Sequence, residues 1–112
     1  MTVTWPVLLL PEAETELARI PAREATAMAH AREKLKAVGL SLGYPHTSDV
    51  RGGDGLRELR PRQGRSQWRA FYRQISKYLV VASIGPEANM NPRGFTSAVN
   101  HAAQRLGDLE EE

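Results

Sequence analysis

The sequence predicts an α+β fold with the element order β-α-α-β-β-β-α. Three observations lead to this prediction: two helical segments near the N-terminus, three strand-like runs joined by short links, and a final amphipathic segment. No repeat, low-complexity tract or linker divides the 112 residues. We therefore expect residues 1–112 to form a single domain, in which the acidic tail at residues 108–112 is flexible.

The N-terminal part is predicted to be an edge strand followed by a helical hairpin. The segment Thr2–Leu10 is β-branched and apolar, and a proline inside it is typical of an edge strand. Pro11 opens a short helix, because proline is favoured at the first helical position. A second helix is predicted from Pro21 to Val38, where apolar residues recur at helical spacing and Gly39 supplies the end. A connection this short favours an antiparallel pair of helices.

The middle of the chain is predicted to form an antiparallel meander. Residues 40–55 are rich in turn formers and lack a sustained period, so we expect a surface connection there. The three strand-like runs that follow cover residues 56–61, 67–75 and 78–84. Their links are short, which favours antiparallel pairing of neighbouring strands. A last helix is predicted to begin at Pro92 with Asn91 as its N-cap, and we expect the helices to cover one face of the sheet.

The composition argues against several classes of site. The chain has no cysteine and only three scattered histidines, so we expect no disulfide, no metal centre and no other cofactor. The apolar run at the N-terminus is only a few residues long and has no basic residue before it, which is untypical of a signal peptide or a membrane span. The sequence therefore favours a cytoplasmic protein without a membrane partner.

Arginine is concentrated in one part of the chain. Between Arg51 and Arg73 there are seven arginines and only two acidic residues, although the net charge of the whole chain is only +2. The planar guanidinium group suits bidentate contacts with phosphate better than the point charge of lysine does. This cluster indicates a binding surface for nucleic acid, and a solvated sheet face with local ion pairs is the alternative.

Strand alternation predicts that many of these charges share one face of the sheet. Side chains two residues apart on a strand point to the same side. Leu59 is therefore expected in the core, opposite its charged neighbours Glu58 and Arg60. The side chains expected on the open face are Glu58, Arg60, Arg62, Arg69, Phe71 and Arg73. Arginines accompanied by a carboxylate and an aromatic ring are the composition of an RNA-binding surface.

Three segments together resemble a known toxin family. GLRELRP is followed by WRAFYR, and both precede VVASIGPEANMNPRGFTSAVNHAAQRL. Their order after a helical hairpin is similar to that in the RelE/ParE superfamily of type II toxins, HigB-like branch, over nearly the whole chain. Members carry a strand that ends in Glu-Leu-Arg or Lys-Leu-Arg, a turn with glycine, and a strand that opens with an aromatic residue and arginine. Here these positions are Glu58-Leu59-Arg60 and Trp68-Arg69.

The resemblance implies a RelE-like, microbial-ribonuclease-type fold and the toxin component of a type II toxin–antitoxin system. Such a toxin is an endoribonuclease that cleaves mRNA on the ribosome and so inhibits translation. It is neutralised by a cognate antitoxin, commonly a helix-turn-helix protein. In the reaction the 2′-hydroxyl of the substrate attacks the adjacent phosphate, and arginines stabilise the charge that grows in the transition state.

The resemblance also implies roles for single residues. Arg69 matches the position of the family's catalytic arginine, and Arg60 on the neighbouring strand is the second choice for the same role. Glu58 stands where some relatives have a catalytic lysine; it is interpreted either as a general base or as a structural ion-pair partner of these arginines. The residues expected to bind RNA are Arg62, Arg65, Arg73, Phe71 and Arg93.

Residues 86–93 depart from the family pattern. Many relatives carry several lysines, or a basic and aromatic pair, at this point, whereas Arg93 is the only base here. This departure supports an alternative function: a superfamily member that does not cleave RNA, such as a gyrase inhibitor of the ParE branch or a module that only binds an antitoxin. His46 is expected in a turn or at an edge, with contact to the substrate as the less favoured alternative. His30 and His101 are expected in helices, on the surface or facing the antitoxin.

Overall fold

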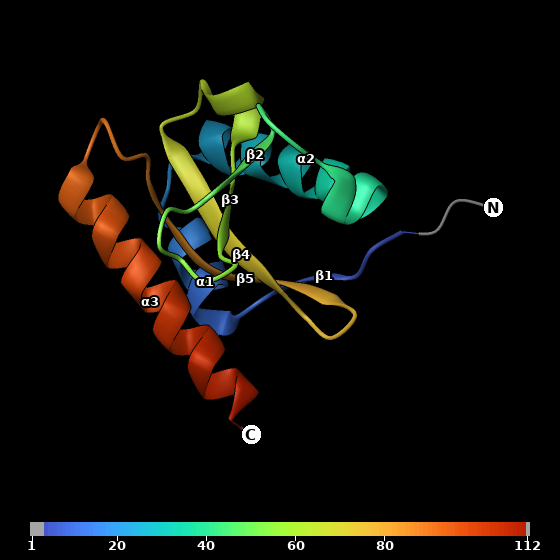
Figure 1. Ribbon diagram of the computed structural model, residues 1–112. Coiled ribbons are helices and arrows are strands. Elements are labelled where there is room, and N and C mark those ends of the chain that lie inside the picture. Colours follow the sequence, from blue (N-terminus) through green and yellow to red (C-terminus); the bar gives the residue numbers. More distant parts are fainter. Residues whose placement is uncertain (1–3, 112) are drawn as a thin grey trace.

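The computed structural model describes residues 4–111, which form a five-stranded sheet with helices on both sides (Figure 1). The strands are ordered β1-β5-β4-β3-β2, with β1 parallel to β5 and the other neighbours antiparallel. In chain order the elements are β1 (Val7–Leu9), α1 (Pro11–Leu17), α2 (Ala22–Val38), the 3₁₀ turn η1 (Gly39–Ser41), β2 (Thr47–Asp49), β3 (Arg57–Leu59), the 3₁₀ turn η2 (Pro61–Gly64), β4 (Trp68–Ile75), β5 (Tyr78–Pro86) and α3 (Pro92–Glu110). This architecture confirms the predicted α+β fold, and β3, β4 and β5 form the predicted meander.

Two differences from the predicted elements lie in the N-terminal half. The strand expected at Thr2–Leu10 is shorter: β1 lies at the edge of the sheet, as predicted, while residues 2 and 3 lie outside the described residues. The connection expected at residues 40–55 contains the short strand β2, which pairs with β3. The sequence of β2, Thr-Ser-Asp, is polar and only three residues long, so no alternation of apolar and polar residues marks it.

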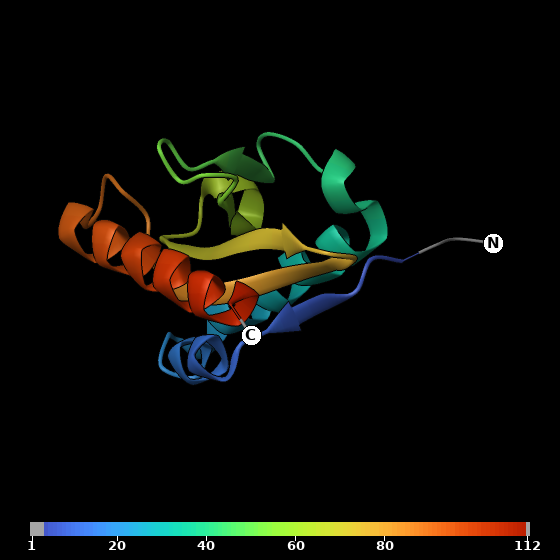
Figure 2. The same cartoon turned by 60° about the horizontal axis from the view of Figure 1, so that its bottom comes forward.

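The sheet is covered on both faces. One apolar core lies between the sheet and the helices α1 and α2, and it includes Met28, Leu35 and Tyr72. A second core lies between the sheet and α3, and it includes Phe71 and Ala102. Figure 2 shows the blue α1 below the sheet and the orange-red α3 alongside it. The expectation that the helices cover one face is therefore wrong, because successive apolar residues on β4 and β5 point to opposite faces and both faces need cover.

Phe71 is consequently a core residue and not part of an RNA-binding surface. Its side chain is fully buried under α3, where its ring meets that of Phe95 edge-on with 5.4 Å between the centroids. The alternation predicted for β4 is present, since Phe71 and Tyr72 belong to opposite cores. Alternation shows which residues share a face, but it does not show what covers that face.

The helix ends follow the signals in the sequence. Gly39 ends α2 with a left-handed φ of 67°. Asn91 caps α3, because its Oδ1 accepts a hydrogen bond from the amide of Gly94 at 2.9 Å. α3 continues through most of the acidic tail to Glu110, whose carboxylate pairs with Arg73 of β4. Within residues 4–111, no helix combines the length and the apolar character needed to cross a membrane.

Candidate functional site

The turn between β3 and β4 holds consecutive residues in the left-handed conformation. Arg62 and Gln63 of η2 have φ values of 56° and 58°, and Gly64 follows with a φ of 93°. Left-handed backbone costs a residue with a Cβ atom about 1–2 kcal/mol. Two such residues in succession persist only if surrounding contacts hold the turn, and strain of this kind is concentrated at binding and catalytic sites.

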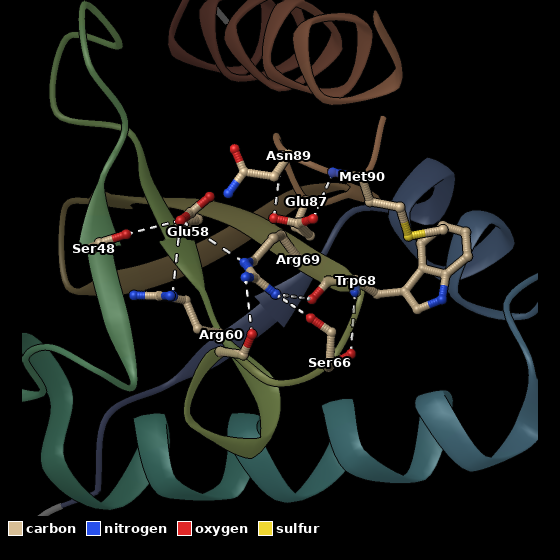
Figure 3. Close-up of polar contacts among 10 residues, drawn as sticks. Ser48, Glu58, Arg60, Ser66, Trp68, Arg69, Glu87, Asn89 and Met90 are labelled. Atoms are coloured by element: carbon tan, nitrogen blue, oxygen red, sulfur yellow. Dashed lines mark hydrogen bonds and ion pairs between the residues drawn. The ribbon is translucent and has the colours of Figure 1, made fainter. Parts of the chain in front are cut away.

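Arg69 of β4 supplies contacts that hold this turn. Its Nη1 donates to the carbonyl oxygens of Ser66 at 2.6 Å and Trp68 at 3.0 Å, and its Nη2 donates to that of Gly64 at 3.3 Å (Figure 3). The side chain is only 4% exposed, and burial lowers the pKa of its guanidinium group against the opposing effect of the charge on Glu58. The structure therefore corrects the expectation that Arg69 lies on an open face. Its side chain folds back onto the turn that precedes β4.

Glu24 of α2 anchors the same turn from the helix side. Its carboxylate accepts hydrogen bonds from the hydroxyl of Ser66 at 2.6 Å and from Nη1 of Arg62 at 3.0 Å. These contacts fix η2 against the first turn of α2. The left-handed residues of η2 are therefore held from both sides, by Arg69 of the sheet and by Glu24 of the helix.

Glu58, the middle residue of β3, lies beside Arg60 and Arg69 (Figure 3). Its Oε1 accepts a hydrogen bond from the Ser48 hydroxyl at 2.9 Å, and lies 3.8 Å from Nε of Arg69 and 4.0 Å from Nε of Arg60. Both Nε atoms are buried without a hydrogen-bond partner among the described residues, so their contacts with Glu58 are electrostatic. We call these four residues the Glu58 cluster. It combines a carboxylate that can accept a proton with guanidinium groups that can stabilise phosphate charge.

The connection between β5 and α3 places a second carboxylate near Arg69. Glu87 accepts hydrogen bonds from the backbone amides of Met90 at 2.6 Å and Asn89 at 3.2 Å, which closes the loop locally. Burial lowers the pKa of Arg69, and the charge of Glu87 is among those that oppose this effect. Arg93 takes no part in this arrangement, since it lines a separate groove of mostly polar residues on α3.

A cavity of about 510 Å³ lies between α2 and η2. We call it the α2–η2 cavity. Its cationic lining residues are Arg23, Lys34, Arg60, Arg62 and Arg65. Two histidines and several apolar side chains complete the lining, and none of the lining residues is a carboxylate. The cavity therefore has a strongly positive wall.

A family model described as phage-derived protein, Gp49-like, matches residues 15–81, which is more than half of the chain. The chain belongs to this Gp49-like family. Its fold is similar to that in the toxin–antitoxin complex RelBE2 from Mycobacterium tuberculosis, with a TM-score of 0.58, 22% identity, and coverage of 79% of this chain and 97% of that chain. It is also similar to that in the archaeal RelE–RelB complex from Pyrococcus horikoshii OT3, with a TM-score of 0.54, 16% identity, and coverage of 74% and 94%. No curated protein matches the chain.

The structure brings together only part of the site predicted for this Gp49-like chain. Glu58, Arg60 and Arg69 form one cluster. Arg62 and Arg65 line the neighbouring cavity, to which Arg60 also contributes. Arg73 pairs with Glu110, and Arg93 lines the separate groove on α3. Phe71 is the cross-strand partner of Glu58, but its ring lies in the core under α3. The single open face expected from strand alternation is therefore replaced by two adjoining features, the Glu58 cluster and the α2–η2 cavity.

Sequence reasoning missed the contribution of α2 to this region. Arg23, His30 and Lys34 recur at spacings of seven and four residues, which places them on one helix face. This signal was available in the sequence, but it lies outside the arginine-rich segment. His46 lies in a turn, as expected, and its side chain also lines the cavity, which the sequence did not indicate. Glu87 lies in the loop where relatives carry basic residues, so its charge gave no indication that it would approach Arg69.

Proposed function

We propose that this protein is the toxin component of a type II toxin–antitoxin system, of the HigB-like branch, and that it cleaves mRNA as a ribosome-dependent endoribonuclease. The similarity of its fold to the RelBE2 and RelE–RelB complexes supports the proposal. The observation that carries it is the Glu58 cluster, in which a partly accessible carboxylate lies between two guanidinium groups. The assignment to the HigB-like branch rests on the segments around Glu58 and Arg69.

The proposed reaction is attack of the substrate's 2′-hydroxyl on the adjacent phosphorus. Glu58 takes the proton of the 2′-hydroxyl, the 2′-oxygen forms a bond to phosphorus, and the bond from phosphorus to the 5′-oxygen of the next nucleotide breaks. The products are a 2′,3′-cyclic phosphate and a 5′-hydroxyl, whose proton comes from solvent. Arg60, which is more accessible than Arg69, stabilises the charge on the phosphorane.

Ser48 and Arg69 act as positioning residues in this proposal. The Ser48 hydroxyl fixes Oε1 of Glu58 by its hydrogen bond. Arg69 holds η2 in its left-handed conformation and adds positive charge next to Glu58. In this conformation the turn packs closely against the side chain of Arg60: a Cβ atom at Gly64 would lie only 2.5 Å from Nη2 of Arg60. A side chain at this position would displace the guanidinium group, and the φ of 93° at Gly64 also favours glycine.

The same proposal assigns roles to the other arginines and names the partners of the protein. Arg62 and Arg65 bind phosphates of the mRNA on the ribosome, because both are exposed at the edge of the α2–η2 cavity. Arg73 pairs with Glu110 and Arg93 lines the separate groove on α3, so we assign neither a part in cleavage. A cognate antitoxin of the helix-turn-helix type neutralises the toxin in the cytoplasm, and one domain of this chain carries the activity.

Induced expression of the wild type and of Glu58→Gln tests the proposal. The wild type should stop growth and cut transcripts inside translated regions. Glu58→Gln should lower cleavage by about 10²–10⁴-fold, which is the usual contribution of a general base. Glu33→Gln removes an exposed carboxylate of α2 and should keep full activity, so it is the matched control. Growth arrest with uncut transcripts would contradict the enzymatic assignment.

Three observations favour a second candidate, a superfamily member that does not cleave RNA. The Nη groups of Arg69 are bound to backbone carbonyls, Glu87 adds negative charge near it, and Arg93 lies on a separate groove. Such a protein would inhibit DNA gyrase, as the ParE branch does, or would only bind an antitoxin. Inhibition of gyrase supercoiling by the pure protein, together with uncut mRNA, would establish the first of these two functions.

A further inference from the structure

We propose that the α2–η2 cavity binds one phosphorylated nucleotide of single-stranded RNA. This inference rests on the proposed function and deepens it, because it names where the substrate is held outside the Glu58 cluster. The main support for this inference is the positive charge of the residues that line the cavity. Five cationic side chains from α2, from η2 and from the residues next to η2 surround one volume, and no carboxylate lines it.

Most of this positive charge is not neutralised by neighbouring side chains. Arg62 pairs with Glu24 at 3.0 Å, and Nε of Arg60 lies 4.0 Å from Glu58. The lining cations without an ion-pair partner in the described part of the chain are Arg23, Lys34 and Arg65. Like charges brought together in this way repel one another, and a ligand with more than one negative charge relieves that repulsion. A nucleotide within an RNA strand meets this requirement through the phosphates on either side of it.

The size and the uncharged part of the lining favour a nucleotide over a bare phosphate ion. A volume of about 510 Å³ lies within the range of about 300–1,000 Å³ that is common for small-molecule sites. Leu42 and Leu59 are buried and give the cavity an apolar surface, while His30 and His46 add two flat rings. Unpaired RNA bases stack on such rings and on guanidinium planes. The base therefore has an apolar and aromatic surface to contact, and the phosphates have the cations.

Arg60 connects the cavity with the Glu58 cluster. It lines the cavity, its Nε lies 4.0 Å from Glu58, and its guanidinium carbon lies 4.7 Å from the ring centroid of the exposed Tyr44. A nucleotide in the cavity therefore has a phosphate beside the arginine that also faces the reacting phosphate. The nucleotide in the cavity is therefore one that is adjacent in the RNA strand to the cleaved bond. Cations grouped around one open pocket suit a nucleotide better than an extended acidic peptide, which would need a row of cations along the surface.

Titration of the full chain with adenosine 3′,5′-bisphosphate, followed by the NMR shifts of backbone amides, tests this inference. We expect saturable shifts between Arg23 and Lys34 of α2 and at Gln63 of η2. Lys34→Ala should raise the Kd about tenfold, because it removes a charge-assisted contact with phosphate. Lys77→Ala removes the same charge at the far end of β4 and should leave the Kd unchanged. Both lysines lie on the surface, so neither variant should alter the fold.

Three outcomes would overturn the inference. Equal weakening by Lys34→Ala and Lys77→Ala would show general attraction of the protein for phosphate. Shifts confined to Glu58 and its neighbours would show that the cavity does not bind the nucleotide, and would leave the proposed ribonuclease function intact. Saturable shifts in the cavity with a glutamate-rich peptide, but none with the nucleotide, would assign the cavity to a protein partner. Nucleotide binding by a wild type that leaves mRNA uncut would instead contradict the proposed function and keep the cavity as a nucleotide site.

Discussion

Replacement of Arg69 by methionine should release the turn between β3 and β4. Methionine keeps much of the apolar stem but removes the donors to the carbonyl oxygens of Gly64, Ser66 and Trp68. Hydrogen bonds to charged groups contribute about 1.5–3 kcal/mol each, and partners left buried without a donor are costly. The three contacts share one guanidinium group and are not additive, so we expect a loss of about 3–5 kcal/mol in the free energy of unfolding.

Urea unfolding followed by circular dichroism measures this loss. Arg51→Met replaces an exposed arginine in the connection before β3, and should change the free energy of unfolding by less than about 0.5 kcal/mol. Arg69→Lys should recover only part of the loss, because an ammonium group does not reach three carbonyls as a planar fork does. A loss below about 1 kcal/mol for Arg69→Met would refute the reasoning, since the removal of a guanidinium group that holds the turn should lower the free energy of unfolding by more than that.

Three further changes test other parts of the structure. Phe71→Ala should lower the free energy of unfolding by about 3–5 kcal/mol in the same assay, because the ring is buried under α3; no change in stability would mean that the ring is exposed. Gln63→Gly should raise it by up to about 1 kcal/mol, since glycine adopts a φ of 58° without steric cost, and a loss would show that the side chain outweighs the strain. Ser48→Ala should lower mRNA cleavage about tenfold, which corresponds to one hydrogen bond, whereas Ser48→Thr keeps the hydroxyl and most of the cleavage. Equal losses for the two serine variants would contradict the positioning role.

Features with a local cause were predictable from the sequence. Pro11 at the start of α1, Gly39 at the end of α2 and Asn91 at the cap of α3 act within one helical turn, and each has the predicted role. The meander follows from short links between strands that have few other partners. β2 gave no comparable signal, because its pairing with β3 is set by the neighbouring strand and not by its own three polar residues.

The site was predictable only in part, because its contacts join segments that are distant in the chain. Alternation correctly groups Arg69 with Phe71, but whether each side chain meets solvent, a helix or a turn depends on elements that strand periodicity does not describe. α3 covers Phe71, and the carbonyl groups of the turn enclose Arg69. Glu24 and Arg62 are separated by most of α2 and two strands, so no local pattern links them. The resemblance to RelE-type toxins singled out Glu58, Arg60 and Arg69, and the structure places these three side chains next to one another. Their roles in catalysis stay a prediction.

The ends produced when the purified protein acts on ribosomes programmed with a defined mRNA give the most direct test of the ribonuclease assignment. We predict that the wild type cuts within the codon at the decoding site and leaves 2′,3′-cyclic phosphate and 5′-hydroxyl ends. Glu58→Gln should produce no cuts above background, while Glu33→Gln should cut as the wild type does. Uncut mRNA with the wild type, or equal cutting by the wild type and Glu58→Gln, would contradict the assignment of Glu58 as the base of an mRNA endoribonuclease.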